Sequence, residues 1–221
     1  MRFLKHALAA LSLSLVATGA LASPSAPKNG VDYRTLDKPQ QTASGQAVEV
    51  TEFFWYSCPH CYAMEPTLVD WVKKQGSNIT FKRVPIAFRD SMVPQQKLYY
   101  ALEAMGKLDE LHVKVFNTIH AQKRLTDTDA QILDFVVKNG IDKAKFLDAY
   151  NSFGVQSKVA RAKQLQEAYQ VDGVPLLAVG GRYLTSPGIV GGSLGSRDEL
   201  ALHTATFQVM DWLVNKVKQG K

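Results

Sequence analysis

The fold is decided by one stretch of the chain, Val48-Glu49-Val50-Thr51-Glu52-Phe53-Phe54-Trp55-Tyr56-Ser57-Cys58-Pro59-His60-Cys61. Its first part is rich in β-branched and aromatic residues, which predicts a buried strand over Val48 to Trp55. After a short turn we expect a helix over Pro59 to Gln75. Proline suits the first helical position because its missing N–H would have no partner there. The only two cysteines of the chain therefore lie at the start of a helix.

Two thiols separated by two residues can form a disulfide with each other, and this position makes them reactive. A thiolate at the start of a helix is stabilised by unpaired backbone N–H groups and by the positive end of the helix dipole. We therefore expect Cys58 to ionise readily and the pair Cys58 and Cys61 to be redox-active.

Three other uses of a cysteine pair fit the sequence less well. A zinc site needs further ligands, and His60 between the thiols is badly placed to bind the same ion. A c-type haem needs histidine directly after the second cysteine, where this chain has Tyr62. A purely structural disulfide would close a very short loop and contribute little stability. The position of the motif favours redox catalysis.

The first 22 residues have the pattern of a cleaved export signal. Arg2 and Lys5 precede an apolar stretch over residues 7–21, and Ala20-Leu21-Ala22 offers small residues for cleavage after Ala22. The apolar stretch is short for a membrane span, so a single membrane anchor is the weaker interpretation. Export leads to an oxidising compartment, where a disulfide is an ordinary state of a cysteine pair.

Without the predicted export signal, the chain is still long enough for one well-buried domain with a subdomain. The formal net charge of the 221-residue chain is +6 and is spread along it, without the basic and aromatic clusters typical of nucleic-acid binding. Residues 23–46 are polar and contain several prolines, so we expect an extended arm. Within this arm, Val31, Tyr33 and Leu36 are placed to add an edge strand.

Strand and helix patterns form two separate units. Residues 79–84 predict a strand that completes a βαβ unit, and Pro66 is expected to kink the helix of that unit. A ββα unit follows near the end of the chain: a strand over residues 174–179, a tight turn at Gly180-Gly181, a strand over residues 182–184 and a helix over residues 197–218.

Helical patterns alone fill residues 93–165, between the two units. Thr126 or Asp127 is expected to cap the third of these helices, and Gly154 is expected to end the fourth. A polar helix from Ser157 onward then returns to the sheet.

A βαβ unit followed later by a ββα unit is the thioredoxin layout. It gives an α/β fold in which residues 47–92 and 166–221 form a thioredoxin-like domain and residues 93–165 an inserted all-helical subdomain. Within this layout the chain resembles the DsbA family of periplasmic thiol:disulfide interchange proteins, through Phe53-Phe54, Cys58-Pro59-His60-Cys61-Tyr62 and Gly173-Val174-Pro175. The resemblance covers essentially the whole mature chain, but the glycine-rich residues 186–196 depart from it.

The resemblance implies roles for the motif residues. Cys58 is expected to be the low-pKa thiol that substrates attack, and Cys61 the buried thiol that resolves mixed disulfides. Pro59 and His60 are expected to set how strongly oxidising the cysteine pair is, with His60 as a donor to the thiolate. An ordinary exposed helix residue is the other interpretation of His60.

Glu52, Val174 and Pro175 complete the expected site. Alternation places Glu52 on an apolar strand face, so its carboxyl is expected to be buried with a raised pKa, although an edge position in water is possible. By resemblance, Glu52 assists proton transfer with Cys61. The resemblance also implies that Pro175 is cis and that the backbone of Val174 pairs with an incoming extended peptide.

Several further residues are given weaker interpretations. Glu65 is a candidate partner for Lys82 or Arg83 in a charged cluster, and Trp55 is expected in the core. The three histidines in helical patterns are interpreted as structural or surface residues: His112, His120 and His203.

The expected function is that of a periplasmic protein disulfide oxidase, which donates the Cys58–Cys61 disulfide to newly exported proteins that contain cysteine pairs. A membrane partner resembling DsbB, with a quinone behind it, would restore the disulfide. We expect a monomer with no bound cofactor, no metal and no nucleic-acid partner. Two rivals are a disulfide isomerase or reductase, for whose dimerisation domain the arm is too short, and a redox-inert chaperone or peptide-binding module.

Overall fold

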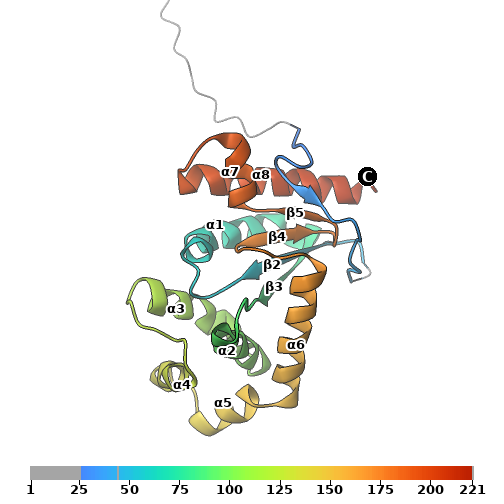
Figure 1. Ribbon diagram of the computed structural model, residues 1–221. Coiled ribbons are helices and arrows are strands. Elements are labelled where there is room, and N and C mark those ends of the chain that lie inside the picture. The colour runs from blue at the N-terminus through green and yellow to red at the C-terminus, as the bar shows by residue number, and fades with distance from the viewer. Residues whose placement is uncertain (1–25, 44, 221) are drawn as a thin grey trace, which may run out of the picture.

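The computed structural model describes residues 26–43 and 45–220, which contain a five-stranded sheet with helices on both faces (Figure 1). The strands are β1 (Arg34–Thr35), β2 (Val48–Phe54), β3 (Ile79–Pro85), β4 (Leu176–Val179) and β5 (Tyr183–Thr185). They lie in the order β1-β5-β4-β2-β3, in which β2 and β3 are parallel and the other neighbours antiparallel. The predicted export signal lies outside the described residues.

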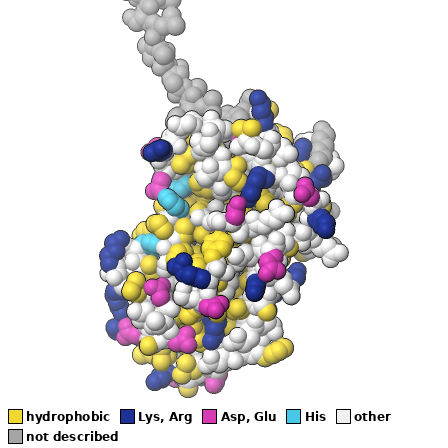
Figure 2. All heavy atoms as spheres, in the orientation of Figure 1, with side chains coloured by type: hydrophobic (Ala, Val, Ile, Leu, Met, Phe, Trp, Pro, Cys, Tyr) yellow, Lys and Arg dark blue, Asp and Glu magenta, His cyan; other side chains and the backbone are white. Residues whose placement is uncertain are grey.

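Helices from different parts of the chain cover the two faces of the sheet. In Figure 1, α8 (Glu199–Lys218) lies above the sheet, and the helices that link β3 to β4 lie below it. The helix α1 (Pro59–Gln75) packs against α8 in the same core. The linking helices are α2 (Val93–Ala104), α3 (Leu108–His120), α4 (Asp129–Lys138), α5 (Lys143–Tyr150) and α6 (Phe153–Ala168). The arrangement is a thioredoxin-like fold with a helical insertion. On the face shown in Figure 2, basic and acidic side chains are both spread over the surface. In the described ranges, no helix combines the length and apolar character that a membrane crossing requires.

A separate apolar core lies on each side of the sheet. The core on the α1 and α8 side joins Val50 of β2 to Leu68 and Leu213, and the core on the other side joins Phe53 to the linking helices. Every residue of β2 is buried, which agrees with its unbroken strand pattern. The predicted strand and the helix over Pro59 to Gln75 are confirmed, and the helix continues through Pro66.

Local capping accounts for the helix boundaries that the sequence predicted wrongly. Thr128, rather than Thr126 or Asp127, caps α4: its hydroxyl accepts the Gln131 N–H at 3.3 Å, and the Gln131 side chain accepts the Thr128 N–H at 3.1 Å. Gly154 does not end a helix. It lies in the first turn of α6, which starts at Phe153, before the predicted Ser157.

The glycine-rich segment 186–196 forms a short helix, α7 (Pro187–Leu194). Ser186 caps it by accepting the Ile189 N–H at 3.1 Å, and Gly195 ends it in a left-handed conformation. Val190 is fully buried and α7 packs on α8, so tertiary contacts stabilise a helix whose glycines disfavour it.

The N-terminal arm adds an edge strand, as predicted. β1 pairs with β5, with Arg34 opposite Leu184, and beyond it the Gln40 N–H donates to the Gly181 carbonyl at 2.7 Å. Gly181 has a φ of +65°, and a Cβ added there would overlap the Gln40 carbonyl oxygen. The hairpin between β4 and β5 therefore needs glycine at this position for both conformation and space.

We predict that Gly181→Ala lowers the free energy of unfolding by about 3 kcal/mol, because it combines backbone strain with overpacking against the arm. Gly106→Ala is the matched control: Gly106 also has a φ of +65°, but no atom lies within 4 Å of an added Cβ. The control should lose only about 1 kcal/mol. Denaturant unfolding of both variants tests this, and equal losses would show that the arm does not pack tightly on the hairpin.

Candidate active site

Cys58 is the N-cap residue of α1, and Pro59 is its first helical residue. The Cys58 backbone is extended, and its sulfur accepts the Cys61 N–H at 3.4 Å. No acidic residue lies in the first turn of α1. Cys58 is 6% exposed and Cys61 is 0% exposed, and both are free thiols. An attacking group can therefore reach Cys58 but not Cys61.

The two thiols have pKa values shifted in opposite directions. The hydrogen bond between the two cysteine side chains is the main cause that lowers the pKa of Cys58 to about 6; burial opposes it, and the backbone N–H groups of Cys61 and His60 support it. Burial is the main cause that raises the pKa of the Cys61 thiol well above its usual value. At neutral pH these shifts favour a thiolate at Cys58 and a thiol at Cys61; when Cys58 is protonated, its S–H can donate to a neighbouring carbonyl.

His60 turns toward α8 rather than toward the thiols. Its Nδ1 lies 3.0 Å from Oε1 of Glu199, and both side chains are exposed. Among the described residues its side chain makes no hydrogen bond to Cys58, so the predicted direct donor role is not seen. Its backbone N–H and the charge of its ring still lower the pKa of Cys58, the ring least of the causes named here.

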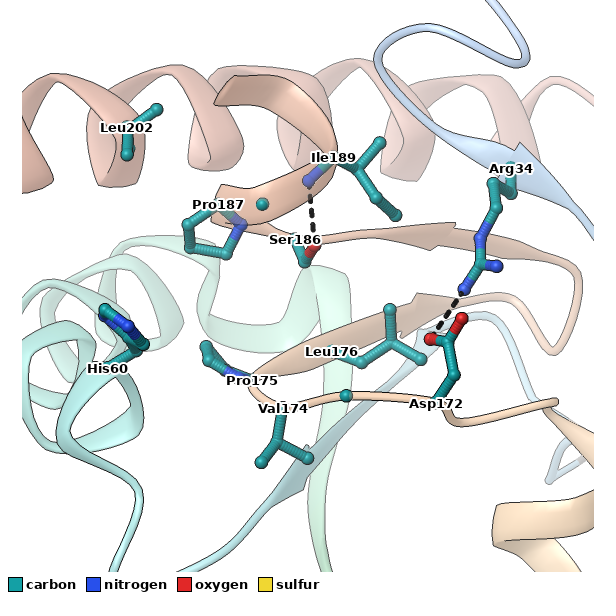
Figure 3. A pocket seen from close by; sticks show the side chains of 12 residues that line it. Arg34, His60, Asp172, Val174, Pro175, Leu176, Ser186, Pro187, Ile189 and Leu202 are labelled. Atoms are coloured by element: carbon teal, nitrogen blue, oxygen red, sulfur yellow. Dashed lines mark hydrogen bonds and ion pairs between the residues drawn. The ribbon is translucent and has the colours of Figure 1, made fainter. Parts of the chain in front are cut away.

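The loop before β4 lies against Cys58. The Val174–Pro175 peptide bond is cis, as the resemblance implied, and the Cys58 thiol donates to the Val174 carbonyl at 3.4 Å. This loop forms one wall of a pocket of about 420 Å³, which Figure 3 shows between His60, the start of β4 and α7. Apolar side chains line most of it: Val174, Pro175, Leu176, Pro187, Ile189 and Leu202.

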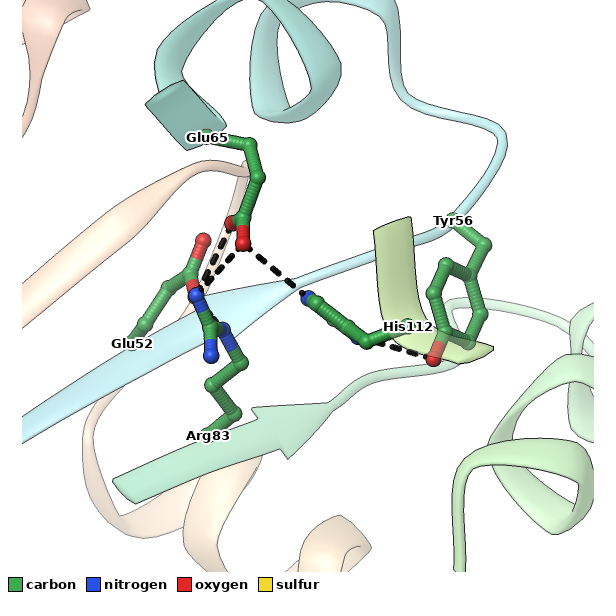
Figure 4. A network of polar contacts seen from close by, with 5 residues as sticks. All are labelled: Glu52, Tyr56, Glu65, Arg83 and His112. Carbon is green, nitrogen blue, oxygen red and sulfur yellow. Dashed lines mark hydrogen bonds and ion pairs between the residues drawn. The ribbon is translucent and has the colours of Figure 1, made fainter. Parts of the chain in front are cut away.

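Glu52 lies in a buried charge cluster with Arg83 and Glu65 (Figure 4). Glu52 and Arg83 are neighbours in the β2–β3 register, and Arg83 Nε donates to Glu52 Oε2 at 2.8 Å. Arg83 Nη2 donates to both oxygens of Glu65 at 2.8 and 2.9 Å. Burial, which exceeds the opposing effect of Arg83, raises the pKa of Glu52 to about 7. Glu52 is thus buried as predicted, and Arg83 rather than Lys82 pairs with Glu65.

The three aromatic residues near the motif differ in how deeply they are buried and in what they contact. Trp55 was expected in the core, but it is only partly buried and lines a second pocket beside Pro59. Tyr56 is instead the fully buried one, and its hydroxyl lies 2.9 Å from His112 Nδ1. Tyr62 is partly buried and stacks on His120, with 4.8 Å between ring centroids.

The histidines contribute more than the sequence indicated. His112 and His203 are buried, which fits a structural role, but His112 Nε2 also lies 3.6 Å from Glu65 Oε1. His120 Nε2 lies 2.8 Å from the Tyr56 carbonyl oxygen. Reasoning from ligand spacing missed these residues because their partners are on other elements.

We predict that Cys61→Ala raises the pKa of Cys58 by about one unit, because the main stabilising hydrogen bond to the thiolate is lost. Cys61→Ser is the matched control, since a hydroxyl can still donate, and its Cys58 pKa should stay closer to that of the unmodified protein. Thiolate absorbance titrated against pH measures the Cys58 pKa in both variants. Equal pKa values in the two variants would assign the effect to the backbone N–H groups instead.

Comparison with known proteins agrees with this geometry. A family model described as a DSBA-like thioredoxin domain matches residues 88–193. The thiol:disulfide interchange protein DsbA of Burkholderia cepacia is 47% identical over 212 residues, covering 96% of this chain and 95% of that protein. DsbA of Bordetella parapertussis is 42% identical, covering 86% and 93% of the two chains. The crystal structure of Pseudomonas aeruginosa DsbA is 36% identical with a TM-score of 0.77, covering 86% and 94%. The chain therefore belongs to the DsbA family of thiol:disulfide oxidoreductases.

Proposed function

We propose that this chain is a periplasmic disulfide oxidase that transfers the Cys58–Cys61 disulfide to newly exported proteins. The observation that carries the proposal is the opposite ionisation of two neighbouring thiols, one accessible and one buried. A stabilised thiolate favours the reduced enzyme, and this makes the disulfide form a strong oxidant. For such a two-electron couple, a change of about 30 mV in reduction potential corresponds to about 1.4 kcal/mol.

The first step is attack by a substrate thiolate on the Cys58 sulfur of the oxidised enzyme. The Cys58–Cys61 bond breaks, a mixed disulfide forms at Cys58, and the electron pair leaves with the Cys61 sulfur. Because burial disfavours a Cys61 thiolate, this sulfur needs a proton. Glu52 is suited to supply it, since a carboxyl with a pKa of about 7 is partly protonated at neutral pH.

The second step releases the oxidised substrate. A second substrate thiolate attacks the substrate sulfur of the mixed disulfide, and Cys58 leaves as a thiolate. A low pKa makes Cys58 a good leaving group, so release of product is favoured. Two electrons have then passed from the substrate to the enzyme, which holds a dithiol.

The pocket beside Cys58 suits an extended, mainly apolar peptide. We propose that the backbone of Val174 pairs with such a peptide, which would recognise a chain with little regard to its sequence. The substrates are then unfolded or folding proteins with cysteine pairs. We further propose that the enzyme is a monomer without a bound cofactor, and that a DsbB-like membrane partner linked to a quinone reoxidises it.

An assay with a reduced peptide that contains two cysteines tests the oxidase assignment. The oxidised protein should convert the peptide to its disulfide in a one-to-one ratio. Cys58→Ser and Cys61→Ser should each abolish the reaction, because a chain with one cysteine cannot hold the intramolecular disulfide that accepts the two electrons of the peptide. When Cys61→Ser is instead given the peptide in its disulfide form, its Cys58 thiolate should attack that disulfide and form a mixed disulfide, with release of one peptide thiol. If Cys58→Ser binds the peptide and acts on it as well as the unmodified protein does, the chaperone or peptide-binding module would be favoured instead.

We also predict that the reduced protein is more stable than the oxidised one near pH 8. The folded pKa of Cys58, about 6, is below the unfolded value of about 8.5. The Cys58 thiolate therefore adds about 3 kcal/mol to the free energy of unfolding of the reduced protein at about pH 8.5, and this contribution is lost as pH falls through about 6. Above about pH 8.5 the raised pKa of Cys61 acts in the opposite direction, because the unfolded Cys61 thiol ionises there and the folded one does not. Closure of so short a loop stabilises the oxidised form by only about 2 kcal/mol.

Denaturant melts of both forms at several pH values measure this difference. As the solution is made acidic, the excess in free energy of unfolding of the reduced form over the oxidised form should shrink and then change sign. A more stable oxidised form at pH 8 would identify the pair as a structural disulfide or a reductant.

A further inference from the structure

A second pocket, of about 430 Å³, borders the cysteine motif and has no part in the function proposed above. Ser57 and Pro59, the two chain neighbours of Cys58, both line it. It shares no lining residue with the pocket beside Val174. A chain attached to Cys58 therefore has two separate pockets within its reach.

Four segments form this second pocket: the turn after β2, the link from β3 to α2, the end of α3 and the loop from α3 to α4. Its apolar lining residues are Trp55, Pro59, Met92, Ile119 and Leu125. Leu125 is 62% exposed, and Pro59 is exposed as well. An apolar surface that is open to solvent and adjoins a reactive group is typical of a site that binds another molecule.

Two of the polar residues that line the second pocket are held by contacts within the protein. The Asp127 carboxylate accepts hydrogen bonds from Gln95 at 2.9 Å and from Ser57 at 3.4 Å. His120 Nε2 lies 2.8 Å from the Tyr56 carbonyl oxygen. These contacts join the helical insertion to the segment that precedes Cys58, so they fix the shape of the pocket.

Two other residues of the second pocket offer hydrogen-bond donors. Arg89 is exposed, and among the described residues only its Nε has a hydrogen-bond partner, the Ser91 hydroxyl at 3.0 Å. Its guanidinium lies 5.9 Å from the centre of the Trp55 ring. Trp55 Nε1 is buried without a hydrogen-bond partner in the described part of the chain, which costs free energy. Peptide carbonyls would pair with Arg89 directly, and with Trp55 once its half-buried ring turns.

The geometry of an extended chain decides which substrate residue reaches the second pocket. A substrate cysteine bonded to Cys58 continues into chain on both sides, and pairing with Val174 uses only one of them. Residues two positions apart in an extended chain point to the same face and lie about 7 Å from each other. Neighbouring Cα atoms of the enzyme, such as those of Cys58 and Pro59, are about 3.8 Å apart. The residue two positions from the substrate cysteine therefore points toward the enzyme and reaches the pocket wall.

We propose that the second pocket is a peptide subsite for a large apolar side chain two residues from the substrate cysteine, on the side away from the segment that pairs with Val174. Trp55 and Leu125 would bury this side chain, and Arg89 would donate to the neighbouring backbone carbonyl. The proposal rests on the proposed function and narrows its substrates. Among cysteines of unfolded chains, those with an apolar residue at this position are oxidised preferentially.

Exchange at a mixed disulfide tests the subsite without relying on oxidase activity. The Cys61→Ser protein carries glutathione on Cys58 and is mixed with a reduced peptide that has a single cysteine. The peptide thiolate attacks the Cys58 sulfur and glutathione leaves as a thiolate, with no net change in oxidation state. Mass spectrometry of the two mixed disulfides gives the exchange constant. Because the bonds broken and formed are alike for every peptide, differences between peptides report their other contacts.

Three peptides are compared, which differ only two residues before and two residues after the cysteine. One has serine at both positions, and each of the others has one serine replaced by leucine. The leucine peptide that fills the second pocket should have an exchange constant about tenfold above that of the serine peptide, as roughly half the burial of a leucine side chain would give.

Leu125→Gln, made in the same protein, identifies that peptide. One leucine peptide should lose about threefold of its advantage over the serine peptide, and the other should keep its own ratio, because only one side of an extended chain passes the second pocket. Leu200→Gln is the matched control, since Leu200 is 67% exposed and does not line this pocket. It should leave all ratios unchanged.

The indole N–H resonance of Trp55 gives an independent measure of where the peptide lies. Trp55→Phe assigns this resonance among those of the tryptophans. It should shift in the mixed disulfide with the leucine peptide that responds to Leu125→Gln, relative to the mixed disulfide with the serine peptide.

Three results would overturn the subsite: leucine peptides no better than the serine peptide, equal losses in Leu125→Gln and Leu200→Gln, or an unmoved Trp55 resonance. The oxidation assay on the unmodified protein is interpreted separately. A protein that shows the expected exchange constants but oxidises no peptide would refute the proposed function and leave the subsite in place.

Discussion

The buried guanidinium of Arg83 is the interaction on which the rest of the site depends. It joins β3 to Glu52 on β2 and to Glu65 on α1, so that one side chain fixes the strand that precedes Cys58 and the helix that follows it. A buried carboxylate without a partner is strongly destabilising, and the loss of one member of such a group typically costs about 3–5 kcal/mol. The positions of the two carboxylates are therefore tightly constrained.

Different surroundings make two chemically identical thiols behave differently. Cys58 keeps a small exposed area and has hydrogen-bond donors around its sulfur, whereas Cys61 is fully buried and its pKa is raised mainly by burial. The carboxylates also differ in their surroundings, since Arg83 gives Glu65 two hydrogen bonds and Glu52 one. Because the pKa values of the two thiols are pushed apart, one is ionised and the other protonated at the same pH.

The sequence predicted what depends on local pattern and failed where distant contacts decide. Strand periodicity and Pro59 were enough to place β2 and the start of α1, and alternation placed Glu52 on a buried face. The partner of Glu52 depends on the β2–β3 register, and that of His60 is Glu199, 139 residues away. Neither partner can be recognised from the residues that surround Glu52 or His60 in the sequence. The helix α7 was missed because its glycines disfavour it, while Ser186 and packing on α8 stabilise it.

The helical insertion holds the short segment between β2 and Cys58. His112 and His120 of α3 contact the side chain and the carbonyl of Tyr56. The next residue, Ser57, accepts a hydrogen bond of 2.7 Å from Gln95, which also donates to Asp127. A free loop at this point would let the Cys58 sulfur move away from the donors that stabilise its thiolate. Since those hydrogen bonds require close approach, the insertion sustains the reactivity of Cys58 by restricting the backbone that carries it.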